Sequence, residues 1–233
     1  MYLLPFPALG GLLAWATIYF LGLRRTKWAE FLLGLVAFFL AMIVQTPIQQ
    51  LSLLALGIRS NADVITRGSA FIVETALWLG FAAGLVQEGV KYFFVKDKDL
   101  RTASFVGLGF GVTEAFFVTI MTAVAGAVMG KGLDVPLGAA LMSLLERYFA
   151  TLFHVGTTVF LAYAAAKGFG KKGLVAMIAV HTLVDSMAAY YQLTGHAMVG
   201  YAVEVILALI ALLLVSYTLP KVKAEKSGEK VIW

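Results

Sequence analysis

Ionisable side chains occur inside the longest apolar stretches of this sequence, where burial is expensive. A charged group within about 20 apolar residues must find a partner, so it is a candidate functional group by default. Ten such residues occur here: Glu74, Glu88, Lys91, Glu114, Glu146, Arg147, His154, His181, Asp185 and Glu204. Carboxylates and imidazoles at one depth could activate water, hold a metal ion or relay protons.

The position of each group along its predicted helix gives its approximate depth. A helix rises about 1.5 Å per residue, so Glu88 and His181 lie roughly 12–14 Å from the nearest basic loop. By the same count Glu114, His154 and Asp185 lie roughly 20 Å from it. We therefore expect these five residues, from four helices, to share one layer. The same arithmetic places Glu74, Glu146, Arg147 and Glu204 nearer the opposite surface.

Helical spacing pairs some of these residues on one face. Glu88 and Lys91 are three residues apart, and His181 and Asp185 are four apart, so each pair shares a helix face. Lys91 would then either neutralise Glu88 or extend to the cytoplasmic surface. Glu114 follows three alternate glycines, and small residues allow neighbouring membrane helices to approach closely. That approach would bring its carboxylate to groups on other helices.

Hydrolysis by an activated water suits two imidazoles and two carboxylates. A carboxylate acts as the general base, and an imidazole polarises the carbonyl or stabilises the oxyanion. Two His and one Glu are also a common zinc ligand set, so a divalent metal such as zinc is a possible cofactor. The sequence has no HExxH motif and no Cys, which excludes a zincin helix and thiolate chemistry.

The elements that must position these groups are membrane helices. With 61% hydrophobic residues, 13% charged residues and a mean hydropathy of +0.90, the chain has too little polar surface for a water-soluble globule. We predict an all-α polytopic protein of the cell membrane, with one transmembrane domain over 1–219 and a short charged tail over 220–233. Its seven predicted transmembrane helices cover 3–23, 29–56, 69–95, 102–129, 135–166, 173–193 and 197–219.

The basic residues predict the orientation of these spans. Thirteen of the 18 Lys and Arg residues fall in one alternating set of loops and the tail, and three fall in the opposite loops. Basic loops are retained in the cytoplasm, so the amino end should lie outside and the carboxyl end inside. These loops explain the net charge of +5 without a nucleic-acid partner. The expected partners are membrane lipid and a membrane-embedded peptide or protein substrate.

Four segments resemble the motifs of a known family: QEGVKYFF at 87–94, GLGFGVTEAFF at 107–117, LERYFATLFHVGTTV at 145–159 and HTLVDS at 181–186. The family is that of the YhfC-type intramembrane proteases, within the broader superfamily of glutamic CAAX prenyl proteases and PrsW-like proteins. The resemblance spans about residues 70–190. It implies an enzyme that hydrolyses a peptide bond in or near the membrane.

The resemblance also implies roles for individual residues. The matched motif positions are Glu88 and Lys91 in the first, Glu114 in the second, Glu146, Arg147 and His154 in the third, and His181 and Asp185 in the fourth. Glu88 or Glu114 would then be the base and His154 its partner on the water. His181 and Asp185 would serve the oxyanion. A bound metal would be held by Glu114, His154 and His181.

Two departures from the family pattern support other functions. Gln87 stands where the pattern has its first Glu, and a glutamine cannot act as a base; Phe110 stands where the glycine motif has a His. The chain is also similar to the seven-helix scaffold subunit of γ-secretase. By that similarity it would be a catalytically silent scaffold in which His154 and His181 hold helices together. Acids and imidazoles at one depth would also suit a proton-coupled transporter.

Overall fold

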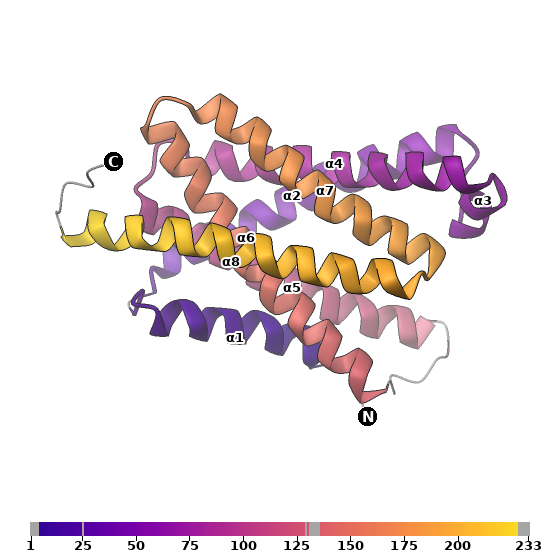
Figure 1. The fold of residues 1–233 in the computed structure, drawn as a ribbon, viewed down its shortest axis with the longest axis horizontal. Coiled ribbons are helices and arrows are strands. Elements are labelled where there is room, and N and C mark those ends of the chain that lie inside the picture. Colours follow the sequence, from indigo (N-terminus) through magenta and orange to yellow (C-terminus); the bar gives the residue numbers. More distant parts are fainter. Residues whose placement is uncertain (1–4, 25, 129, 131–135, 228–233) are drawn as a thin grey trace.

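The computed structural model describes residues 5–24, 26–128, 130 and 136–227, and within them all regular secondary structure is helical (Figure 1). The helices are α1 (Phe6–Phe20), α2 (Trp28–Ala55), α3 (Asn61–Thr66), α4 (Ser69–Val95), α5 (Leu100–Val128), α6 (Leu137–Ala166), α7 (Gly170–Thr194) and α8 (Ala197–Ser227). The helical architecture expected from the hydropathy pattern is confirmed.

Six of these helices, α2 and α4 to α8, are long and apolar enough to cross a membrane. The protein is therefore a multi-pass membrane protein. Helix α1 is also apolar but has 15 residues, and the short α3 lies in the polar connector between α2 and α4. Helix α8 continues through Pro220 to Ser227, so part of the predicted tail is helical.

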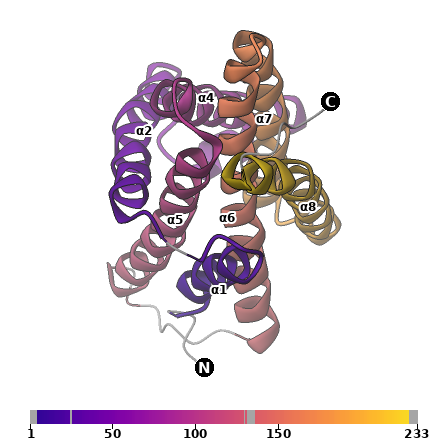
Figure 2. The same cartoon turned by 90° about the vertical axis from the view of Figure 1, so that its left-hand side faces the viewer.

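Helix α6 is at the centre of the bundle. It contacts α1, α4, α5, α7 and α8 and is the most buried of the six long helices. Figure 2 shows it in the middle of the molecule, with α1, α5, α7 and α8 around it. Polar side chains of α6 can therefore contact groups on several neighbouring helices.

Helices α4 and α7 approach each other closely at two glycines. Gly80 and Gly84 form a GxxxG pattern on α4, a spacing that lets membrane helices touch through their backbones. A Cβ atom added at Gly84 would lie 2.9 Å from the carbonyl oxygen of Ile178 on α7. Glu88 follows one turn later on the same face of α4, and the close contact therefore brings it to His181.

Helix α5 approaches α6 in the same way. A Cβ atom added at Gly107 would lie 2.7 Å from the carbonyl oxygen of His154, and one at Gly111 would lie 2.8 Å from Cα of Thr151. Gly109, on another face of α5, is closed by Phe31 of α2. The three alternate glycines thus press α5 between α2 and α6, which sets Glu114 beside His154.

The Gly84→Ala substitution should lower the stability of the bundle, because the added methyl group meets backbone and Thr182 of α7. Forcing extra volume into a packed contact costs about 1–3 kcal/mol. The matched control is Gly89→Ala on the same helix, where an added Cβ meets nothing within 4 Å. We expect thermal unfolding in detergent, followed by circular dichroism, to show a lower midpoint for the first variant only. Equal midpoints would contradict the close α4–α7 contact.

Candidate active site

Two fully buried charged residues of α4 form the centre of a polar cluster. The side chains of Glu88 and Lys91 are 0% exposed, and their charged atoms are 2.6 Å apart. The same carboxylate oxygen of Glu88, Oε1, lies 2.6 Å from Nδ1 of His181 on α7. Of the two alternatives for Lys91, the pairing with Glu88 is therefore present, and it extends to a second helix.

The Lys91 ammonium has an acceptor for each of its three hydrogens. It donates to Glu88 Oε1 at 2.6 Å, to Thr157 Oγ1 at 2.7 Å and to His154 Nδ1 at 3.2 Å. An ammonium has three donors and no acceptor, so its hydrogen-bonding capacity is filled. The rings of Phe110 and Phe153 lie 5.4 and 5.9 Å from Nζ, close enough for cation–π attraction.

His154 connects this centre to a second ion pair. Because Lys91 donates to Nδ1 of His154, the ring proton belongs on Nε2, which donates to Glu114 Oε2 at 2.6 Å. The other oxygen of Glu114 lies 3.3 Å from Nη1 of Arg147. Arg147 also pairs with Glu146, its neighbour in the sequence. The depth count had separated Arg147 from the layer of Glu114, but the structure joins them.

His181 lies between two carboxylates. Its Nδ1 faces Glu88, and its Nε2 lies 3.4 Å from Oδ2 of Asp185, one turn along α7. A continuous chain of polar contacts therefore crosses the bundle, through Glu146, Arg147, Glu114, His154, Lys91, Glu88, His181 and Asp185. The residues in the middle of this chain of contacts, from His154 to His181, are buried, whereas the side chains of Glu114 and Asp185 are 20% and 35% exposed.

The two residues that depart from the family pattern differ in their relation to the polar cluster. Gln87 does not join the chain of polar contacts; it donates to Gln45 Oε1 on α2 at 3.0 Å. Phe110 is fully buried, and its ring centroid lies 4.8 Å from that of His154. An aromatic ring therefore packs against the cluster at the position where the family pattern has an imidazole.

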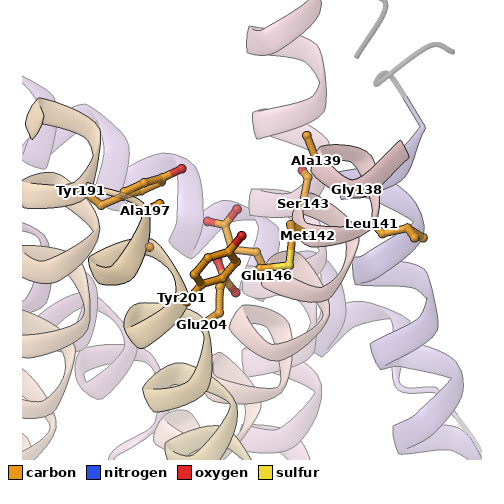
Figure 3. A pocket seen from close by; sticks show the side chains of 11 residues that line it. Gly138, Ala139, Leu141, Met142, Ser143, Glu146, Tyr191, Ala197, Tyr201 and Glu204 are labelled. Atoms are coloured by element: carbon orange, nitrogen blue, oxygen red, sulfur yellow. The ribbon is translucent and has the colours of Figure 1, made fainter. Parts of the chain in front are cut away.

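The remaining two membrane acids lie outside the cluster. Glu74 is exposed, near the carboxyl end of α2 and the amino end of α4. Glu204 lines a cavity of about 760 Å³ together with Glu146, and Figure 3 shows these two side chains beside each other between α6 and α8. None of Glu88, Lys91, His154 and His181 lines this cavity. The cavity therefore lies at the Glu146 end of the chain of polar contacts, away from the buried residues at its centre.

Thr157, which accepts a hydrogen bond from Lys91, is not ionisable and was not among the predicted site residues. Thr157 is three residues from His154, so the helical spacing used for the other pairs would have found it. Gln45, the partner of Gln87, was not predicted either. Nothing in the local pattern relates residues 42 positions apart on two helices.

Comparison with known proteins identifies one family over part of the chain. Residues 131–207 match the model of the YhfC intramembrane metalloprotease family. The match confirms the resemblance for two of the four motifs, those at 145–159 and 181–186. It covers a third of the chain, including Arg147, His154, His181 and Asp185, whereas Glu88 and Glu114 lie outside it. No curated protein and no solved structure matches the chain.

The metal that the YhfC family name implies does not fit the side chains as they are arranged here. In the described part of the chain, no group of three or more His, Asp and Glu side chains could hold a metal ion. Glu114, His154 and His181, the set expected from the sequence, do not form such a group. Both ring nitrogens of His154 face other side chains, Lys91 and Glu114, and both nitrogens of His181 face carboxylates.

Proposed function

We propose that this protein is an intramembrane endopeptidase in which Glu114 activates the attacking water. One observation carries the proposal: Glu114 is hydrogen-bonded to His154 and ion-paired with Arg147, yet its side chain remains partly exposed. Glu88, the other candidate base, is fully buried and accepts two hydrogen bonds on one oxygen. The match to the YhfC family supports the same reaction class.

The contacts around Glu114 favour a definite order of proton transfers. Glu114 takes a proton from water as the water attacks the peptide carbonyl, and later returns a proton to the leaving amine. His154 keeps Glu114 oriented through its Nε2 proton. Nε of Arg147 is buried and has no hydrogen-bond partner among the described residues, so it is free to donate to the oxyanion. The geometry favours Arg147 over His181 in this role, because both nitrogens of His181 already face carboxylates.

The proposed membrane arrangement has seven spans, with the amino end outside and the carboxyl end in the cytoplasm. The six long helices and the apolar α1 support the number, and the alternation of basic loops supports the direction. With 15 residues α1 rises about 22 Å, less than the hydrocarbon thickness of about 30 Å, a mismatch that bilayer thinning or flanking side chains reaching to the interface would accommodate. The substrate would be a peptide segment embedded in the same membrane.

Cleavage in isotopically labelled water tests the proposed reaction. The purified protein is reconstituted in phosphatidylcholine liposomes with a panel of single-span peptides, and products are identified by mass spectrometry. Hydrolysis in H₂¹⁸O should place one labelled oxygen in each new carboxyl group. Products that also form with the Glu114→Gln variant, or no products with any peptide of the panel, would contradict the proposal.

A catalytically silent scaffold is the second candidate. It is favoured by the closed centre of the cluster, where the Lys91 ammonium and both imidazoles are saturated with partners and Oε1 of Glu88 accepts two hydrogen bonds. Such saturation suits a structural role. A scaffold predicts that His181→Ala lowers thermal stability while the wild-type protein cleaves none of the peptides.

A further inference from the structure

We propose that the Lys91 ammonium is a built-in cation that occupies the place of a metal ion, and that removing it uncovers a site for a divalent transition metal. The ligands of the uncovered site would be Glu88, His154 and His181. This inference concerns the ion content of the protein and does not depend on whether the protein cleaves peptides.

The first observation is the set of atoms around Nζ of Lys91. A carboxylate oxygen, a hydroxyl oxygen and an imidazole nitrogen surround it at 2.6, 2.7 and 3.2 Å. Carboxylate oxygen and imidazole nitrogen are also common ligands of zinc. A zinc ion would draw these atoms to about 2.0–2.2 Å, so the side chains must close inward once the lysine is gone.

The second observation is the orientation of the two imidazoles. Each turns Nδ1 toward the centre, His154 to Lys91 and His181 to Glu88. Each also places Nε2 against a carboxylate, of Glu114 at 2.6 Å and of Asp185 at 3.4 Å. Histidines that bind metals usually donate their second N–H to a carboxylate in this way. The carboxylates that would orient the two imidazoles in a metal site are therefore present, although the centre of the cluster holds the Lys91 ammonium.

The third observation is an unused oxygen. Oε2 of Glu88 is buried and has no hydrogen-bond partner among the described residues, although the residue is 0% exposed. A buried carboxylate oxygen normally has a partner. In the absence of Lys91, Oε2 of Glu88 would be available to a cation entering the space left by the lysine side chain, and Oε1 would follow once Nδ1 of His181 releases its proton and binds the metal.

The ammonium and a metal ion exclude each other at this position. Nζ lies within hydrogen-bond distance of two of the three proposed ligands, and the third, His181, binds the same oxygen of Glu88. If the lysine moved aside, Glu88 would lose its ion pair with the ammonium and keep only its contact with His181. Phe110 and Phe153 close the cluster on the side of Nζ with carbon atoms. Lys91 thus occupies the position that a metal ion bound to Glu88 would need.

The test compares metal uptake by the wild-type protein with that of Lys91→Ala. Both are purified in detergent, stripped with a chelator and dialysed against Co²⁺ or Zn²⁺, and metal is counted by elemental analysis. We expect no bound metal in the wild type. Lys91→Ala should bind one ion per chain, with the intense visible absorption of tetrahedral Co²⁺ and a higher melting temperature when the metal is present.

Two control variants separate the proposed site from non-specific binding. Lys91→Arg retains a cation and Lys96→Ala removes an exposed lysine, so neither should gain a metal. In the Lys91→Ala background, His154→Ala should abolish uptake, and Asp185→Asn should weaken it by roughly 10–100-fold because the carboxylate that orients His181 is lost.

Two results would overturn the inference. One is a folded Lys91→Ala protein that binds no metal. The other is a wild-type protein that retains one ion per chain and melts at a lower temperature after chelation. The second measurement decides the matter even where Lys91→Ala does not fold.

Discussion

Replacing Lys91 with methionine should lower the free energy of unfolding by about 3–5 kcal/mol, because it leaves Glu88 as a buried charge without its partner. Methionine has nearly the length of lysine, so the loss reflects charge and hydrogen bonding more than volume. Glu88, Thr157 and His154 would all lose a donor at once. Reversible unfolding in mixed micelles, followed by circular dichroism, measures the change.

A double-mutant cycle identifies the source of that loss. The Glu88→Gln substitution removes the charge that Lys91 neutralises, so the double variant should be less destabilised than the sum of the two single changes. Residues in direct ionic contact typically couple by about 0.5–3 kcal/mol. Strictly additive losses would mean that the two side chains stabilise the bundle independently, contrary to their 2.6 Å contact.

The Glu114→Gln substitution should lower kcat for peptide cleavage by about 10²–10⁴-fold, the usual contribution of a general base. Glutamine keeps the shape of the side chain and can still accept from His154, but it cannot take a proton from water. KM should change little, because the substrate contacts remain. Steady-state cleavage of a fluorogenic membrane peptide in liposomes gives both constants.

The matched control for this experiment is Glu74→Gln, the same chemical change at an exposed acid of α4 that lies outside the cluster. It should retain wild-type kcat, and both variants should keep the wild-type helix content. A Glu114→Gln protein that cleaves at the wild-type rate would exclude Glu114 as the base, and comparable losses in both variants would point to a general effect on the membrane domain.

The helices and the principal polar residues could be predicted from the sequence, because both follow from the cost of burial in lipid. Long apolar stretches must be helical, and an acid or imidazole within them must have a partner. The pairing of His181 with Asp185 also followed, since it lies within one helix. The contacts of Glu88 with His181 and of Gln87 with Gln45 did not, because helical periodicity identifies a face and not the helix opposite it.

Helix crossing explains why depth along the chain was an incomplete guide. The count of residues from the basic loops placed Arg147 roughly 10 Å beyond Glu114. The guanidinium nonetheless reaches the carboxylate, because a long side chain covers several ångströms along the membrane normal and α6 crosses its neighbours at an angle (Figure 1). The GxxxG pattern at Gly80 and Gly84 indicates the α4–α7 contact, but it was not used in the prediction.

Because Glu88 and Lys91 are three residues apart on α4, they can neutralise each other before any other helix is in place. A newly synthesised α4 can therefore enter the lipid with Glu88 and Lys91 already ion-paired, which lowers the free-energy cost of its insertion. Glu114 has no such companion within its own helix and gains one only when α6 arrives. Because α5 is synthesised before α6, α5 depends on α6 for its stable insertion in the bilayer.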